Sequence, residues 1–438
     1  FYTEPFANFL ESLTNMSGFE SVLTMNTGAE AVETAIKAAR RWGYFTKGIS
    51  ENKAEIIVAD GNFHGRTTTI VGFSSEESYK RGFGPFSKGF VEAKFCWSGC
   101  SKEESIESFK EKINKNTCAI LVEPIQGEAG IRVPEKGWLH ELRELCNEND
   151  ILLILDEIQS GLGRTGKLFA FQHEDIIPDG LILGKALGGA MMPISAFLSS
   201  KNVMDHFNSG SHGSTFGGNP LASKIATRAL ELLYEDNLID NSSELGSYFK
   251  SKLRSIDNNI IKEVRGKGLW IGMELNKHNF NAKDLCLMLL NEGLLCKETH
   301  KSVIRFAPPL MITKKEIDWA IEKILTERAE LNLNETKLQK ISSLVKEYKS
   351  SLLSEAYLEA LINSTINLEI DSVEIQSFYE KNKTLFKLNE DIFKLAFIEL
   401  PLDFSDTYQI RSKVRRFKPE DKFFLDSIAY RFKNFSFS

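Results

Sequence analysis

The sequence predicts an α/β fold that is built around a mostly parallel sheet. Short apolar segments alternate with longer amphipathic segments through residues 1–230, the pattern of strands that helices cover on both faces. The chain has 438 residues, 42% hydrophobic and 26% charged, which is ordinary for a globular protein of two or three domains. The expected strands are Glu55–Ala59, Ala119–Glu123, Ile151–Leu155, Leu181–Leu183 and Ile194–Leu198, with helices between them, for example Glu104–Asn114 and Trp138–Glu148.

Two polar residues follow buried strands in a way that indicates a cofactor site. Asp156 comes directly after the strand Ile151–Leu155, and Lys185 comes shortly after Leu181–Leu183. The carboxyl ends of parallel strands meet at one edge of a sheet, where ligands bind. Pyridoxal phosphate (PLP) needs both groups, because its aldehyde forms a Schiff base with a lysine and its ring nitrogen stays protonated beside a carboxylate. A lysine after a strand is more commonly a solvated loop residue, so this pair needs support from other segments.

The segment Asn26–Ala31 predicts the start of a helix that runs to about Tyr44, because Ala31, Ala35, Ala38, Ala39 and Trp42 recur at helical spacing. Unpaired N–H groups at its first residues, at the positive end of the helix dipole, are able to bind a phosphate. A plain N-cap followed by a permissive glycine explains the same residues, so this segment alone does not establish a phosphate site.

Longer strings carry a family resemblance. They are Met25–Ala31, Arg41–Tyr44, Gly61–Thr67, Gly82–Phe86, Val122–Gly130, Asp156–Gly161, Leu183–Leu187, Gly213–Pro220 and Arg305–Pro309. In this order, from residue 1 to about 325, the chain resembles the class III, fold-type I, PLP-dependent aminotransferases, most closely the ornithine aminotransferases. The resemblance implies a PLP-transferase fold with a large PLP-binding domain at residues 1–230 and a small α+β domain at 231–328.

The resemblance assigns roles around the cofactor ring. It implies that Lys185 forms the covalent link and later moves the proton, and that Asp156 pairs with the ring nitrogen. It places Gln159 near the ring hydroxyl and Phe63 against the face of the ring. His64, beside Phe63, is expected to line the pocket.

The phosphate is expected to lie between two subunits. The resemblance implies that Gly28 and Ala29 bind it through backbone N–H groups, while Thr215 reaches the phosphate of the neighbouring subunit. A homodimer is therefore expected, because neither subunit alone supplies all of these groups.

Three further residues are expected to bind the substrates. The resemblance places Arg66 on a substrate carboxylate, and Arg305 on the α-carboxylate of glutamate with Glu128 as a switchable partner. An arginine that is paired with a carboxylate tolerates a substrate without a carboxylate there, whereas a free arginine attracts one.

These roles imply an ornithine–oxo-acid aminotransferase. It would move the δ-amino group of ornithine to 2-oxoglutarate and yield glutamate semialdehyde and glutamate in a ping-pong cycle. An acetylornithine or 4-aminobutyrate aminotransferase is the alternative within the class. An inactive fragment that is joined to a chaperone-like binding module is the alternative from another class.

Both ends of the chain depart from the family. The resemblance implies that about 110 family residues precede Phe1, and that a chain without them binds PLP poorly. Beyond about residue 330 glycine and tryptophan are absent, which predicts a mainly helical domain at 329–438. Its helices are expected at Lys337–Leu361, Asp371–Lys381, Ser405–Arg416 and Pro419–Phe432, with a strand at Phe393–Leu400. The string Val373–Leu388 weakly resembles the chaperone-like region of parvulin-type prolyl isomerases.

Composition argues against several other classes of function. The formal net charge of −6 gives no electrostatic reason to expect binding to nucleic acid or to an anionic membrane. The six cysteines do not have zinc spacing, so no metal is expected. The sequence has no apolar stretch of about 18 residues, which argues against a transmembrane helix. The resemblance implies small amino-acid and 2-oxo-acid substrates as partners, and a location in the cytoplasm.

Overall fold

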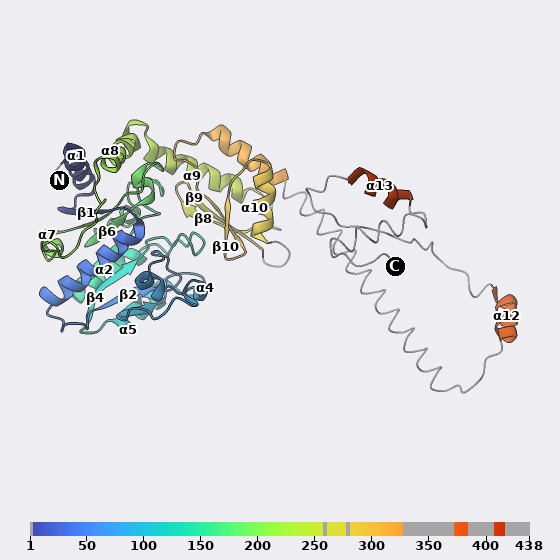
Figure 1. Ribbon diagram of the computed structural model, residues 1–438, viewed down its shortest axis with the longest axis horizontal. Coiled ribbons are helices and arrows are strands. Elements are labelled where there is room, and N and C mark those ends of the chain that lie inside the picture. Colours follow the sequence, from blue (N-terminus) through green and yellow to red (C-terminus); the bar gives the residue numbers. More distant parts are fainter. Residues whose placement is uncertain (1–2, 257–260, 277–280, 327–371, 384–406, 417–438) are drawn as a thin grey trace. The chain divides into compact units, whose positions relative to one another are not determined.

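The computed structural model describes residues 3–256, 261–276, 281–326, 372–383 and 407–416. The chain divides into two units, Phe1–Ser343 and Leu344–Ser438, and each is considered by itself. The first unit contains two sheets and the helices that cover them (Figure 1). In the second unit the described helices are α12 (Ser372–Lys381) and α13 (Thr407–Arg416).

The large sheet of the first unit has seven strands in the order β1-β7-β6-β5-β4-β2-β3. Strands β6, β5, β4, β2 and β3 are mutually parallel, and β7 runs antiparallel to β6 and β1. This confirms the predicted α/β fold with a mostly parallel sheet. The strands are β1 (Ser21–Met25), β2 (Glu55–Ala59), β3 (Phe90–Ala93), β4 (Thr117–Val122), β5 (Leu152–Asp156), β6 (Gly180–Leu183) and β7 (Ser195–Ser199).

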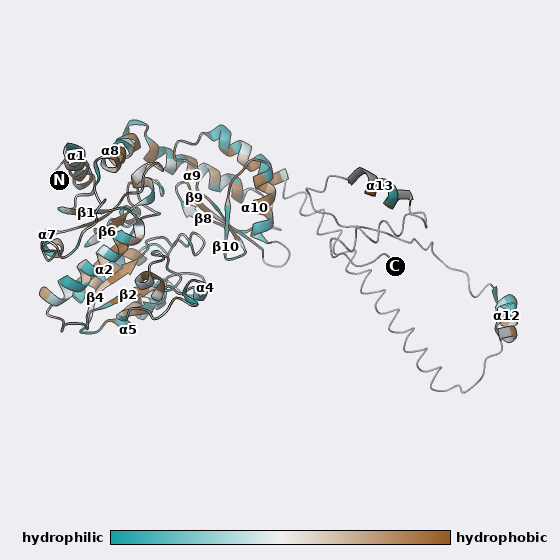
Figure 2. Ribbon diagram, viewed as in Figure 1, coloured by the Kyte–Doolittle hydropathy of each residue, from teal (hydrophilic) through white to brown (hydrophobic). Residues whose placement is uncertain are grey.

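Helices cover both faces of the large sheet. Along the parallel strands, Ile57, Ile120 and Leu153 pack into one buried cluster, while their neighbours Ile56 and Ile154 pack into another. Each fully buried side chain of this kind contributes roughly 1.5–3 kcal/mol. Strands β2 and β4 are accordingly hydrophobic in Figure 2, and α2 carries both hydrophilic and hydrophobic residues. The helices of this part are α1 (Glu4–Ser17), α2 (Gly28–Phe45), α3 (Thr68–Gly72), α4 (Glu77–Lys80), α5 (Lys102–Lys112), α6 (Trp138–Glu148) and α7 (Lys201–Met204), with short 3₁₀ turns η1 (Ala170–His173) and η2 (Lys185–Gly188).

The second sheet is antiparallel throughout, with the order β10-β11-β9-β8. It has its own buried cluster, which includes Leu253, Ile271, Leu285 and Ile304. Before this sheet along the chain comes α8 (Pro220–Glu235), whose Ala222, Ala226 and Leu230 belong to the buried cluster of the large sheet that contains Ile57. The elements of the second sheet and its helices are α9 (Leu238–Arg254), β8 (Ile261–Lys267), β9 (Trp270–Leu275), α10 (Ala282–Asn291), β10 (Lys297–Thr299) and β11 (Val303–Phe306), and residues 314–326 are helical. The predicted domain limits at 230 and 328 stay predictions.

The predicted elements differ from the observed ones mainly at their ends. The helix at Trp138–Glu148 and the strand at Glu55–Ala59 have the expected bounds, and the other four expected strands differ at their ends by one or two residues. In the second unit α12 and α13 lie within expected helices. The elements expected at 337–361, 393–400 and 419–432 lie outside the described residues, as does the last part of the parvulin-like string.

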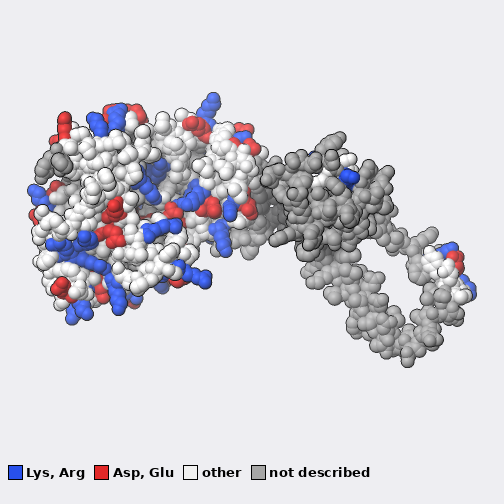
Figure 3. Space-filling model, in the orientation of Figure 1, with Lys and Arg blue, Asp and Glu red and all other residues white. Residues whose placement is uncertain are grey.

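Charged side chains of both signs are interspersed on the face of the first unit that Figure 3 shows. Such a mixture produces no broad field of one sign on this face. Among the described residues, none of the helices combines the length and the apolar character that a membrane crossing requires.

Candidate active site

The structure brings Asp156 and Lys185 to the same edge of the large sheet. Asp156 ends β5 and pairs in register with Ile182 of the adjacent parallel strand, and Lys185 follows that strand after Gly184. Both side chains line one cavity of about 200 Å³. Lys185 has a φ of +43°, a left-handed conformation that is uncommon for a residue with a side chain. Backbone strain of this kind concentrates at functional sites.

The surroundings of Lys185 favour a neutral amine. Burial lowers its pKa, and the charges of Glu128 and Asp156 oppose this shift without reversing it. Within the described part of the chain the ammonium group makes no hydrogen bond or ion pair, so its nitrogen is available. A lysine with a lowered pKa is an activated nucleophile.

Asp156 is held in a fixed orientation by two donors. The ring of His64 lies with Nδ1 2.8 Å from Oδ2, and the backbone N–H of Ile158 donates to Oδ1 over 3.0 Å. Burial lowers the pKa of His64, but the hydrogen bond to Asp156 and the charges of Asp156 and Glu123 outweigh it, so the pKa is raised. Nδ1 of the protonated ring therefore donates to the carboxylate of Asp156. The sequence placed His64 near the pocket but gave no signal of this partner, which is 92 positions away.

The amino end of α2 faces the cavity with free donors. Gly28 and Ala29 line the cavity, and their N–H groups have no acceptor among the described residues. Thr27 and Glu30 form a capping box, so the predicted N-cap is present together with the unpaired N–H groups. A Cβ at Gly28 would lie 2.8 Å from Cδ1 of Ile158, so a larger residue there would displace that side chain. The unpaired N–H groups at the amino end of the helix suit a phosphate.

Phe63 lines the same cavity and is positioned by a buried acid. Its backbone N–H donates to Oε2 of Glu123 over 2.9 Å, and the N–H of Gly127 donates to Oε1 over 3.3 Å. Burial raises the pKa of Glu123 to about 7. Glu123 thus ties the loop of Phe63 to the loop that leads to Glu128, a role that the sequence did not reveal.

Arg66 is exposed and stacks on aromatic rings. Its guanidinium carbon lies 4.9 Å from the ring centroid of Tyr79 and 5.7 Å from that of Phe63. It makes no ion pair within the described residues, so its donors are free to bind a carboxylate.

Glu128 and Arg305 form the predicted ion pair. Nη1 of Arg305 donates to Oε1 of Glu128 over 2.8 Å, with exposures of 9% and 22% for the two side chains. Burial raises the pKa of Glu128, but its hydrogen bond to Arg305 and the charge of Arg305 hold the pKa below its usual value. Nε of Arg305 is buried without a partner, and Nε2 of Gln159 lies 3.5 Å from Oε1 of Glu128. The ion pair is therefore formed, but Nε of Arg305 still lacks an acceptor.

Thr215 does not line the cavity that contains Lys185 in its own chain. Its side chain is exposed, in the segment between α7 and α8. The expected contact of Thr215 with the phosphate of a neighbouring subunit stays a prediction.

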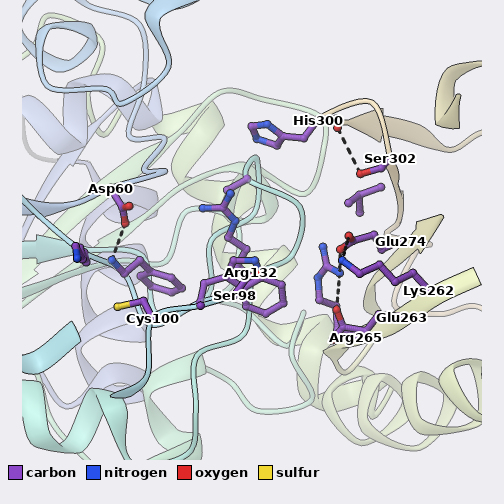
Figure 4. Close-up of a pocket in the computed structure, with 16 residues that line it drawn as sticks. Asp60, Ser98, Cys100, Arg132, Lys262, Glu263, Arg265, Glu274, His300 and Ser302 are labelled. Atoms are coloured by element: carbon purple, nitrogen blue, oxygen red, sulfur yellow. Dashed lines mark hydrogen bonds and ion pairs between the residues drawn. The ribbon is translucent and has the colours of Figure 1, made fainter. Parts of the chain in front are cut away.

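A second, charged cavity of about 920 Å³ lies beside this site (Figure 4). Asp60, Arg132 and His300 line it and also line a smaller cavity of about 310 Å³, which reaches Phe63 and Glu128.

A buried ion-pair network on one wall of the charged cavity supports Glu128. Nη1 of Arg265 donates to Glu263 and Glu274 over 2.9 and 2.6 Å, and its other nitrogens donate to the carbonyl oxygen of Gly130. Figure 4 shows this network around Arg265. Gly130, which is two residues beyond Glu128, is thereby fixed to the small sheet.

The residues around the small cavity fit PLP. Lys185 supplies an amine, Asp156 a carboxylate acceptor, Phe63 an aromatic ring, and the amino end of α2 free N–H donors. Gln159 also lines the cavity, and its expected place near the ring hydroxyl stays a prediction. Among the described residues no group of three or more His, Cys, Asp or Glu side chains is arranged to hold a metal ion.

The comparisons with known proteins agree with this arrangement. Residues 1–326 match the family "Aminotransferase class-III". The ornithine aminotransferase of Macrococcus caseolyticus is 54% identical over 324 residues, which cover 74% of this chain and 79% of that protein. Ornithine aminotransferase 2 of Staphylococcus aureus (strain MRSA252) is 55% identical over the same shares of the two chains.

Two solved structures are also similar. The ornithine aminotransferase of Toxoplasma gondii ME49 has a TM-score of 0.72 and 39% identity, covering 76% of this chain and 78% of that one. The acetylornithine aminotransferase of Elizabethkingia anophelis has a TM-score of 0.66 and 45% identity, covering 75% and 80%.

The fold, the site and these matches define a PLP-dependent transferase that acts on amino groups. The chain belongs to the class III aminotransferases.

Proposed function

We propose that this chain transfers the δ-amino group of ornithine to 2-oxoglutarate, with PLP as cofactor, and yields glutamate semialdehyde and glutamate. The ion pair of Arg305 with Glu128, with 2.8 Å between Nη1 and Oε1, is the observation that carries the choice of substrate. Relatives that are 52–55% identical and named ornithine aminotransferases support the same choice.

Residues at different places around the small cavity have different roles in the reaction. PLP, when bound, supplies an electrophilic carbon and a protonated ring that accepts electrons. Asp156, which His64 and the N–H of Ile158 orient, would pair with the protonated ring nitrogen of the cofactor. Lys185 Nζ would accept the proton at the reacting carbon of the substrate, a task for which a lowered pKa is suitable.

The ion pair explains how one site accepts two different substrates. Ornithine brings its δ-amine to the reacting position and has no carboxylate near Arg305, so the paired, neutralised form of Arg305 suits it. Glutamate and 2-oxoglutarate bring an α-carboxylate to the same place, and Arg305 can exchange Glu128 for it. Arg66, which has no acidic partner among the described residues, is free to bind the remaining substrate carboxylate.

A homodimer and a cytoplasmic location are part of the proposal. The apolar groove of about 610 Å³ that also reaches Lys185 and Gln159 leaves the site open on one side, which supports a covering subunit. Thr215, exposed and away from its own cavity, is available to a neighbour's phosphate site.

An acetylornithine aminotransferase is the second candidate, because the similar structure from Elizabethkingia anophelis has that name. The test is turnover with ornithine, N-acetylornithine or 4-aminobutyrate as donor and 2-oxoglutarate as acceptor. We expect kcat/KM for ornithine to exceed the others by about 10- to 100-fold, the usual range for discrimination by one changed contact. Preference for N-acetylornithine would replace the proposal with the second candidate.

A further inference from the structure

Two cysteines of the small-sheet region lie close enough to react with each other. Cys286 is on α10 and Cys296 directly precedes β10, and their sulfur atoms are 3.5 Å apart, within hydrogen-bond distance. The turn between them is well defined, because Gly293 has a φ of +86° and the N–H of Leu294 donates to the carbonyl of Leu289 over 2.8 Å. The fold therefore holds the two thiols side by side.

We propose that Cys286 and Cys296 form a redox modification site, which a small-molecule disulfide such as oxidised glutathione converts into an intrachain disulfide. The sulfur atoms, which are 3.5 Å apart, need to approach to about 2.05 Å for the bond to form.

The exchange proceeds in two balanced steps. The thiolate of Cys296 attacks one sulfur of the small disulfide, so a mixed disulfide forms and one small thiolate leaves. The sulfur of Cys286, on losing its proton, then attacks Cys296 and expels the second small thiolate. The two protons from the cysteines end on the two released thiols, and the two electrons from the protein sulfurs reduce the small disulfide.

Accessibility and acidity assign the order of these steps. Cys286 is only 6% exposed, whereas Cys296 is half-buried and can be reached from solvent. The contact with Cys286 lowers the pKa of the Cys296 thiol, while the contact with Cys296 and burial raise that of Cys286. A lower pKa and better access make Cys296 the first nucleophile.

The other four cysteines lack this arrangement. Burial raises the pKa of Cys118 and of Cys146 to about 12 and hides both side chains. Burial also raises the pKa of Cys96 and Cys100, and neither sulfur lies in hydrogen-bond contact with another cysteine. These four thiols serve as internal controls for the pair.

The position of the pair connects it to the substrate end of the site. Cys296 precedes Lys297, which pairs in register with Arg305 of β11, and Thr299 of the same strand donates to the carbonyl oxygen of Glu128. A disulfide would tie α10 to the strand that supports the Glu128–Arg305 ion pair.

The test uses the whole chain, reduced and then exposed to oxidised glutathione. Trypsin releases residues 284–297 as one peptide that contains both cysteines, and a glutamate-specific protease cuts it after Glu292. We expect the oxidised peptide to be lighter by two hydrogen atoms and its two halves to stay linked until a reductant is added. The variant Cys286→Ser should stop at a mixed disulfide on Cys296, and Cys296→Ser should leave Cys286 unmodified.

Three results would overturn the proposal. In the first, the wild-type peptide stays fully reduced. In the second, the wild-type peptide retains glutathione on Cys296 and forms no disulfide with Cys286. In the third, Cys286 in the Cys296→Ser variant is modified as fast as Cys296 in the wild type. Because wild-type protein gives the first two readings, the result does not depend on whether either variant folds.

Discussion

The cofactor end and the substrate end of the site are built in different ways. At the cofactor end, Asp156 and Lys185 come from adjacent parallel strands of one sheet, and His64 is fully buried against Asp156. At the substrate end, Arg66 is exposed on a loop, and Arg305 comes from the second sheet to meet Glu128. The first end is fixed by strands that share a core, whereas at the second end the side chain of Arg305 reaches that of Glu128 from another sheet through an ion pair.

This difference matches what each end has to do. A cofactor that stays bound through both half-reactions needs groups that do not move, and buried hydrogen bonds supply this rigidity. Two substrates of different charge need a group that can change partner, and a partly exposed ion pair can open at modest cost. Substitutions at the cofactor end should therefore affect turnover, while those at the substrate end should affect choice of substrate.

The largest expected effect is that of Lys185→Ala. Without the amine the chain cannot move the proton at the substrate carbon, and we expect turnover of ornithine with 2-oxoglutarate to fall by about 10³-fold or more. The variant Lys201→Ala, which removes an exposed lysine at the start of α7, is the matched control and should keep its activity. A Lys185→Ala protein that retains a tenth of the wild-type rate would remove Lys185 from the mechanism.

Asp156→Asn should have the next largest effect. The amide keeps the size of the side chain but supplies no charge to the ring nitrogen, and we expect kcat to fall by about 10²-fold, as for the loss of one positioned electrostatic contact. The same change should lower the pKa of His64, because burial then acts without the opposing charge of Asp156. Titration of His64 by NMR checks this second effect independently of activity, and an unchanged pKa would show that Asp156 does not control it.

The sequence predicted the cofactor end more fully than the substrate end, for a physical reason. Apolar strands that end in Asp156 and shortly before Lys185 are local patterns, and the rules of parallel sheets bring their ends together. The expected strands were correct in kind. Glu55–Ala59 has the expected bounds and the other four differ at their ends by only one or two residues, because hydrophobic runs mark the buried part of a strand and not its last hydrogen bond.

The rest of the site depends on contacts between distant residues. The pairing of Arg305 with Glu128 spans 177 positions and two sheets, and only the family resemblance gave it. The partner of His64 and the link from Glu123 to Phe63 had no signal at all, because a buried polar residue finds its partner only when the chain has folded. The four strands of the small sheet were expected only as part of a small domain.

Glu128→Ala should change preference more than rate. With Glu128 absent, Arg305 is free to attract a carboxylate, so kcat/KM for glutamate should rise relative to that for ornithine by roughly 10- to 100-fold, since a charged hydrogen bond contributes about 1.5–3 kcal/mol. Glu107→Ala, which removes an exposed carboxylate on α5, is the control and should leave the ratio unchanged. If the ratio is unchanged in Glu128→Ala as well, the ion pair does not select the substrate.

The smallest expected effect concerns stability at the fixed end. In the folded chain the pKa of His64 is raised above its ordinary value of 6.5, so the protonated ring stabilises the fold through Asp156. This contribution is fully present below about pH 6.5 and is lost as the pH rises through the folded-state pKa. His64→Asn keeps a donor near Asp156 but cannot take up a proton. Because the charge of His64 also lowers the pKa of Glu123, the two proteins are compared with Glu123→Gln in both, so that Glu123 does not titrate in either. The free energy of unfolding of Glu123→Gln minus that of Glu123→Gln/His64→Asn, measured by denaturant titration from about pH 5 to about pH 9, should decrease with rising pH. A difference that stays level or grows would mean that His64 is neutral in the fold, and the contrast between a charged, fixed cofactor end and a movable substrate end would then rest on Asp156 alone.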